Sequence, residues 1–259
     1  QGYLRNPLAD PGLFGIAPGA ALGAVAALWF GYAASPWLLP AFALIGAGGA
    51  MALLAAIAGR TGGIALFTLA GLMVASLAGA LTALAISMAP NAFAMSEIVM
   101  WLNGALTDRS WREVWLATPL VALGVLLLWR SGKSLDALTL GEPVARSLGV
   151  EPGRLLWLLI VGIGLTVGAG VAVAGIIGFV GLIVPHGVRL LVGADYRILL
   201  PLSFLAGAVF LTLADVLART VMSPAEVPIG VITAFVGVPL FLLLLRRSLG
   251  ARPGAETGS

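Results

Sequence analysis

Few residues in this sequence have side chains that could perform catalysis or hold a metal ion. His186 is the only histidine and cysteine is absent, which excludes zinc-type ligand sets and histidine-based triads. Gly132-Lys133-Ser134 matches the end of a phosphate-binding loop, but Leu127 stands where that loop needs its first glycine. We therefore expect no catalytic residue, no metal site and no cofactor bound by this chain, and we do not expect it to be an enzyme.

Two pairs of ionisable residues lie within or beside apolar segments. Asp215 and Arg219 are four residues apart, a spacing that suits an ion pair on one helix. His186 and Arg189 are interpreted as interfacial groups at the inner end of an apolar segment. No series of carboxylates crosses the apolar segments, which argues against a carrier driven by protons or sodium.

A polar segment, Thr139 to Arg154, separates two segments that are almost wholly apolar. Its prolines and glycines predict one or two short helices joined by a glycine turn and lying flat against the membrane. Leu140, Val144 and Leu148 recur at four-residue spacing, so they form one apolar stripe that a cytoplasmic partner could cover. A merely solvated loop would need no such stripe.

The composition indicates where these residues lie. Hydrophobic residues make up 60% of the chain and charged residues 10%, whereas soluble domains carry about 25% charged residues. The mean hydropathy is +1.08, and several apolar runs approach the roughly 20 residues that cross a hydrocarbon core as a helix. The chain therefore belongs in a bilayer, and its basic residues lie between apolar segments rather than in a patch for nucleic acid.

We predict an all-α, polytopic transmembrane bundle that forms a single domain over residues 1–259. It has eight spans, at about 14–31, 37–58, 64–87, 114–130, 155–175, 176–192, 198–217 and 229–245. The boundary between the fifth and sixth spans is marked only by glycines.

The basic residues predict the orientation of these spans. If the first span runs outward, the outer loops hold only Arg109, Arg112 and Arg219 of the 14 lysines and arginines. The remainder lie inside, as the positive-inside rule expects: Arg5, Arg60, Arg130, Lys133, Arg146, Arg154, Arg189, Arg197, Arg246, Arg247 and Arg252. Both ends of the chain are then cytoplasmic.

Two further patterns leave alternatives open. Gly15, Gly19 and Gly23 recur every four residues, which favours close helix packing over a flexible role in gating. Residues 90–113, with nearby tryptophans, predict a short helix at the outer interface. That helix is either a plain interfacial anchor or a gate or docking surface for an extracytoplasmic partner.

Four segments resemble the FecCD-type permeases of bacterial ABC importers, which include the cobalamin, haem and ferric-siderophore systems. The resemblance covers the whole chain. It rests on RNPLADPGLFGIAPGAALGAV (5–25), LGEPVARSLGV (140–150), GIIGFVGLIVPHGVRLLVGADYRILLP (175–201) and ADVLARTVMSPAEVPIGVITAFVGVPLF (214–241). Members of the family have ten spanning helices, so we expect the native chain to extend upstream by two.

The resemblance implies a multi-pass permease of the bacterial inner membrane that imports a metal chelate. Its expected partners are a second permease copy or a close paralogue, two ATPase subunits that bind ATP and magnesium, and a periplasmic binding protein. An ion-coupled secondary carrier or another metal-ion permease is the alternative.

The resemblance also assigns candidate site residues. Arg219 matches an outward arginine that meets the binding protein, so docking competes with the simple ion pair. Gly62, Gly63 and Ile64 form a candidate gate. The ATPase-coupling segment, at about 134–153, contains Leu140, Gly141, Glu142, Ala145, Arg146, Leu148 and Gly149.

Overall fold

The computed structural model describes residues 1–4, 6, 9–30, 35, 37–58, 64–193, 195–220 and 227–250. Within these ranges every regular element is a helix, which confirms the predicted all-α class. The elements are η1 (Pro11–Phe14), α1 (Ile16–Trp29), α2 (Leu38–Ala58), α3 (Ile64–Ser87), α4 (Ala92–Leu102), α5 (Trp111–Arg130), α6 (Gly132–Thr139), α7 (Glu142–Ser147), α8 (Pro152–Ala174), α9 (Val180–Val192), α10 (Tyr196–Thr220) and α11 (Ile229–Gly250).

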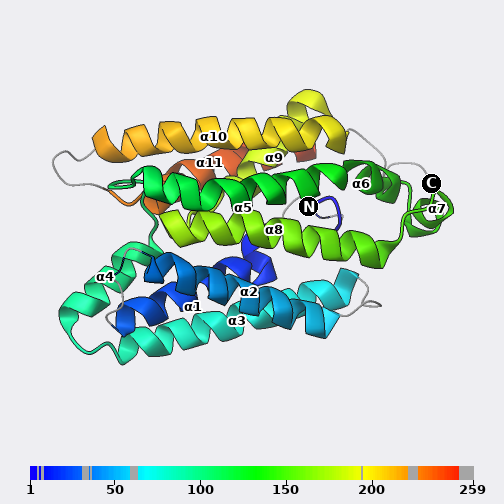
Figure 1. Ribbon diagram of the computed structural model, residues 1–259. Coiled ribbons are helices and arrows are strands. Elements are labelled where there is room, and N and C mark those ends of the chain that lie inside the picture. Colours follow the sequence, from blue (N-terminus) through cyan, green and yellow to red (C-terminus); the bar gives the residue numbers. More distant parts are fainter. Residues whose placement is uncertain are drawn as a thin grey trace, which may run out of the picture.

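The long helices lie side by side, and the short helices α4, α6 and α7 lie at the two ends of the bundle (Figure 1). Helices α6 and α7 project from one end, and α4 lies at the other. We name the α6–α7 end cytoplasmic and the α4 end outer, as the distribution of basic residues predicts. The predicted coupling segment and the predicted interfacial helix therefore lie at opposite ends of the molecule.

Five helices in the described part of the chain are long and apolar enough to cross a membrane: α2, α3, α5 with its continuation into α6, α8 and α10. The other three predicted spans correspond to the shorter apolar helices α1, α9 and α11 of the described chain. The expectation of a continuous helix over 176–192 differs from the structure, because α9 begins only at Val180 and has 13 residues. At 1.5 Å per residue it extends about 20 Å, short of a core about 30 Å thick.

Small residues bring α1 and α2 together along their backbones. Gly23 faces the carbonyl oxygen of Phe42, and Gly46 faces that of Gly19, so closely that a Cβ atom at either glycine would collide with the opposite helix. On α8, Gly168 packs in the same way against Ala47 of α2. The glycine pattern thus marks helix packing, as predicted, because small side chains let helices approach where lipid supplies no hydrophobic drive.

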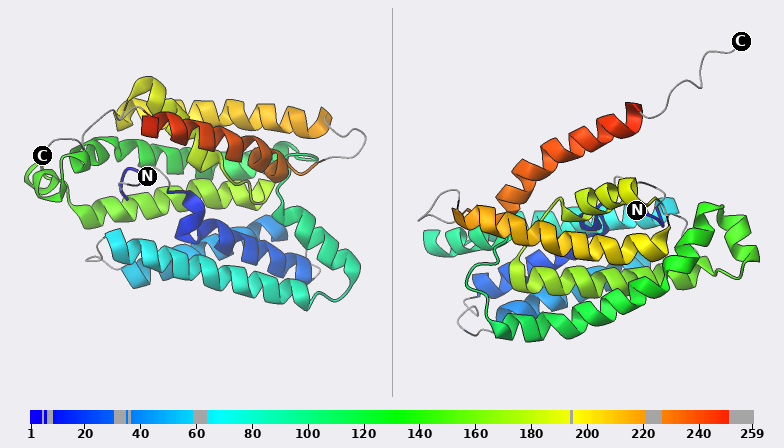
Figure 2. Two further views of the ribbon diagram at one scale, coloured as in Figure 1. Left: turned by 180° about the vertical axis from the view of Figure 1, so that it is seen from behind. Right: turned by 90° about the horizontal axis from the view of Figure 1, so that it is seen from above.

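Helix α8 is the centre of the bundle, and α11 is its most peripheral member. Half of the apolar stretch of α8 is buried, against 11% for α10. Helix α11 starts against α9 and α10 and then leaves the bundle at an angle (Figure 2). The outer surfaces of α3, α10 and α11 expose many large apolar side chains, as expected for surfaces that face lipid or another membrane subunit.

Candidate functional site

Glycines shape the cytoplasmic helix α7 at both of its ends. Gly141 precedes the helix with φ 106°, and Gly149 follows it with φ 84°, which are conformations that other residues adopt only with strain. The N–H of Val150 donates to the carbonyl oxygen of Ala145, and the N–H of Gly149 donates to that of Arg146, both at 3.0 Å. This pair of bonds is a Schellman motif that ends α7, while Gly141 makes the turn between α6 and α7. The polar segment from Thr139 to Arg154 thus holds one short helix, α7, with a glycine turn on each side.

A hydrophobic cluster anchors α6 and α7 to the ends of the spanning helices. It joins Leu135 and Leu138 of α6 and Ala145 of α7 to side chains of α8, α9 and α10. The side chain of Ala145 is fully buried, so it faces the chain's own core and is not available to a partner. Leu155, Leu159, Val184, Val188, Tyr196 and Leu199 complete the cluster.

The opposite side of this segment carries the predicted apolar stripe. Leu140, Val144 and Leu148 are 65%, 43% and 63% exposed. They lie on the side of the segment opposite to the buried Ala145. Beside them, Arg146 Nη2 donates to Glu142 Oε1 at 2.8 Å. The segment thus presents leucine and valine side chains, flanked by an exposed ion pair, on a base that is packed into the bundle.

Asp136 on α6 forms a contact that sequence reasoning missed. The backbone N–H of Tyr196, the first residue of α10, donates to Asp136 Oδ1 at 2.9 Å. Arg197 Nε lies 3.6 Å from Asp136 Oδ2. The only local signal was an acidic residue between two apolar positions of a short helix, and that pattern does not identify a partner 60 residues away.

At the outer end, the predicted interfacial segment is divided between two helices. Helix α4 covers only residues 92–102, and Asn91 caps it by accepting a hydrogen bond from the N–H of Ala94 at 2.8 Å. Trp111 belongs to the first turn of α5, where Ser110 and Glu113 form a capping box. Trp111 and Trp115 are exposed, as expected of interfacial anchors, whereas Trp101 packs against the core.

Three loops meet at the outer end through backbone hydrogen bonds. The N–H of Ala105 donates to the carbonyl oxygen of Ala174 at 2.8 Å, and the N–H of Ile229 donates to that of Gly104 at 3.1 Å. The N–H of Gly230 donates to the backbone carbonyl oxygen of Asn103 at 3.1 Å. The loop after α4 therefore fixes the end of α8 to the start of α11.

The remaining predicted site residues lie apart from the coupling segment. On α10, Arg219 Nε donates to Asp215 Oδ2 at 2.9 Å, and the Arg219 side chain is 46% exposed. This confirms the ion pair, while docking stays a prediction. Of the candidate gate, Gly62 and Gly63 lie outside the described residues, and Ile64 is the first residue of α3.

His186 is buried rather than interfacial, which corrects its sequence-based interpretation. It is 7% exposed, and its ring lies 6.2 Å from that of Phe241 on α11. The local sequence placed it near a helix end, but α11 packs over that part of α9. Among the described residues, no three histidines and carboxylates converge to form a metal site.

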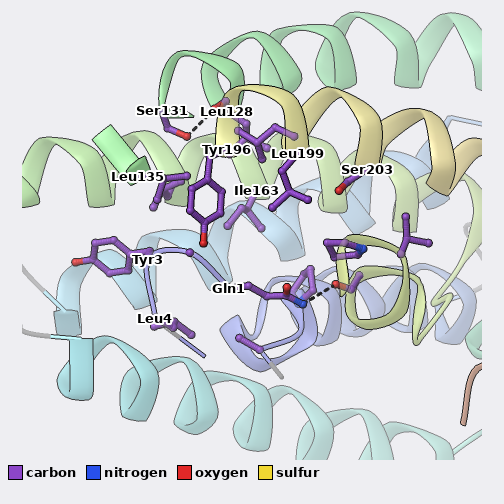
Figure 3. A pocket seen from close by; sticks show the side chains of 18 of the residues that line it. Gln1, Tyr3, Leu4, Leu128, Ser131, Leu135, Ile163, Tyr196, Leu199 and Ser203 are labelled. Atoms are coloured by element: carbon purple, nitrogen blue, oxygen red, sulfur yellow. Dashed lines mark hydrogen bonds between the residues drawn. The ribbon is translucent and has the colours of Figure 1, made fainter. Parts of the chain in front are cut away.

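A cavity of about 340 Å³ lies beside the hydrophobic cluster of α6 and α7. Figure 3 shows Tyr3, Tyr196, Leu135 and Leu199 around it, with the hydroxyl of Tyr196 directed toward its interior. Most of its lining is apolar. A cavity of this size is at the lower end of the range for small-molecule sites. The described residues of its lining include no carboxylate or imidazole to hold a metal ion.

Comparison with known proteins gives one consistent result over nearly the whole chain. A model of the FecCD transport family matches residues 1–247. The uncharacterized ABC transporter permease protein YvrB of Bacillus subtilis is 40% identical over 97% of this chain and 73% of its own length. The vitamin B12 import system permease protein BtuC of Salmonella typhimurium is 40% identical over 96% of this chain and 76% of its own length.

A solved structure agrees with these relatives. The chain superposes with a TM-score of 0.90 and 34% identity on a proposed metal-chelate type ABC transporter in an inward-facing conformation. The match covers 95% of this chain and 79% of the other. The chain thus spans about three quarters of the length of each of these proteins.

Proposed function

Because this chain belongs to the FecCD transport family and is the membrane-spanning permease subunit of an ABC importer, we propose that it moves a metal chelate into the cytoplasm. ATP hydrolysis on separate ATPase subunits drives the transport. A periplasmic binding protein delivers the chelate, and a second permease copy or a close paralogue completes the pathway.

The exposed stripe of Leu140, Val144 and Leu148 is the observation that supports ATP coupling most directly. Burial of apolar side chains drives most protein association, and the described part of the chain leaves this stripe exposed. Its base is packed against α8, α9 and α10. A partner that binds the stripe can therefore transmit movement to spanning helices, provided that it contacts two conformations differently.

The substrate is proposed at the level of a class. BtuC relatives are named for cobalamin or vitamin B12 import, and the similar solved structure is described as a metal-chelate type transporter. Cobalamin, haem and ferric siderophores all belong to this class. Among the described residues that line the 340 Å³ cavity there is no carboxylate or imidazole that would choose among them, and we expect the binding protein to set the selectivity.

Charge insertion in the stripe tests the coupling assignment. In the full-length permease co-expressed with its ATPase, Leu148→Glu should reduce the co-purified ATPase by roughly tenfold, the effect of losing one hot-spot side chain. Leu191→Glu is the matched control, because Leu191 is also exposed and lies at the inner end of α9. Equal retention of ATPase by both variants would overturn the assignment.

Uptake measurements test the transported class. The complete transporter is reconstituted in proteoliposomes. Its binding protein is added to the external solution, and ATP is enclosed in the lumen. ATP-dependent uptake of cyanocobalamin, haem or a ferric siderophore is expected for one of the three. Uptake that follows an imposed proton or sodium gradient, and not ATP, would favour the ion-coupled carrier instead.

A further inference from the structure

We infer that Asp136 is a positioning residue that makes α6 and the cytoplasmic end of α10 move as one body during transport. The inference rests on the proposed function, because it states how movement of the coupling segment reaches a spanning helix. Its basis is the contact between Asp136 and Tyr196, which joins elements 60 residues apart.

The hydrogen bond satisfies a group that α10 cannot satisfy itself. The first N–H groups of a helix have no acceptor within the helix. Asp195, directly before α10, accepts from the N–H of Arg197 at 2.9 Å, whereas the N–H of Tyr196 donates to Asp136 at 2.9 Å. The start of α10 is therefore capped jointly by its own preceding residue and by α6.

The hydrogen bond between Asp136 and Tyr196 lies beside a buried hydrophobic cluster that α6 and α10 share. Leu135, adjacent to Asp136, and Leu138 pack in the same hydrophobic cluster as Tyr196 and Leu199 of α10. The Asp136 side chain is 28% exposed, while its second partner Arg197 is 61% exposed and 3.6 Å away. An exposed ion pair of that length contributes little, so the bond to the Tyr196 N–H is the polar contact that holds α6 to α10 beside the shared hydrophobic cluster.

Helix α10 extends this connection across the membrane. It has 25 residues, or about 37 Å at 1.5 Å per residue, which exceeds the hydrocarbon thickness. Its outer end carries Arg219, the candidate docking residue. A displacement of α6 is thereby conveyed to the helix that reaches the outer surface.

Three variants separate the link from simple helix capping. Asp136→Ala removes the acceptor, while Asp136→Asn keeps a side-chain oxygen that can accept from Tyr196. Asp195→Ala is the matched control, because it removes a cap of the same helix without disconnecting α6. Binding-protein stimulation of ATP hydrolysis should fall by roughly tenfold in Asp136→Ala, the value expected for a charged hydrogen bond, and remain in the other two.

A distance measurement provides a readout that stability alone would not change. This sequence has no cysteine, so nitroxide labels can be attached through Lys133→Cys, at an exposed position of α6, and Leu202→Cys on α10. In the otherwise unchanged complex the label distance should stay the same with and without ATP. In the Asp136→Ala background it should change with nucleotide, because α6 then moves without α10.

The outcomes identify which statement fails. If the unaltered complex shows neither ATPase co-purification nor stimulation by the binding protein, the proposed function fails. If that complex is stimulated and Asp136→Ala equals it in both readouts, the link is overturned. Equal losses of stimulation in Asp136→Ala and Asp195→Ala would also overturn it, because the loss would then come from uncapping α10 and not from disconnecting α6.

Discussion

At the cytoplasmic end of the bundle, α6 and α7 are held by side chains, whereas at the outer end three loops are held by backbone groups. The cytoplasmic contacts are the hydrophobic cluster around Leu135 and Ala145 and the bond from Tyr196 to Asp136. The outer contacts are hydrogen bonds among the backbones of Asn103 to Ala105, Ala174 and Ile229 to Gly230.

This difference teaches what each end tolerates. A segment anchored by side chains can expose its other face. The segment around α7 does so with Val144 on the helix and with Leu140 and Leu148 just outside its ends. A junction of backbones leaves no room for added atoms, and Gly104 lies where a Cβ atom would be 2.5 Å from the carbonyl oxygen of Ile176. Substitutions should therefore act through polarity at the cytoplasmic end and through volume at the outer end.

The largest expected effect is at Ala145. Ala145→Asp places an unpaired carboxylate in the buried cluster, which should cost about 3–5 kcal/mol of folding free energy and reduce the yield of monodisperse protein in detergent. Ser147→Asp, at an exposed position of the same helix, is the control and should behave as the unaltered chain does. An Ala145→Asp protein that keeps its melting temperature but loses the ATPase would show that Ala145 faces the partner after all.

Gly104→Ala should have the next largest effect and tests the backbone junction. The substitution combines a positive φ of 70° with the contact to Ile176, for a cost of about 3 kcal/mol. The melting temperature in detergent should fall by roughly 10 °C. Gly149→Ala is the control, because Gly149 has a φ of 84° but open space around it. Its cost should be only about 1–2 kcal/mol. If the two variants lowered the melting temperature equally, the added volume at Gly104 would not be the cause.

Arg219→Glu tests whether the outer end also carries a partner surface. If Arg219 meets an acidic group of the binding protein, the reversal should weaken binding by roughly tenfold at low ionic strength, and less at high ionic strength. Asp215→Asn is the control that breaks the ion pair and keeps the arginine. Affinities that are equal for Arg219→Glu and the unaltered transporter at low ionic strength would leave only the ion pair.

The smallest effect is expected for Arg146→Gln, which removes the exposed pair with Glu142. Pairs of this kind contribute about 0.3–0.5 kcal/mol, so the melting temperature should fall by roughly 1–2 °C. Raising the salt concentration should reduce the difference from the unaltered chain. A shift as large as that of Ala145→Asp would contradict the view that side-chain packing, rather than surface charge, holds this end together.

The helices could be predicted from local composition, whereas the candidate site could be predicted only in part. The spacing of Leu140, Val144 and Leu148 predicted an exposed stripe on a short helix, and the structure exposes it. The same pattern could not tell that the adjacent Ala145 points into the chain, because an alanine fits both faces of such a helix. For His186 the local sequence was misleading, since α11 covers it.

The sequence by itself determined that the chain lies in a lipid bilayer and in what order its helices follow one another. A bilayer core has no water to satisfy backbone groups, so long apolar runs must become helices, and polar runs such as Thr139 to Arg154 must lie outside. Only the tertiary structure decided which helix ends meet. The Asp136 bond to Tyr196 and the junction at Gly104 join residues at least 60 positions apart, and no local periodicity records such pairings because they depend on how whole helices pack.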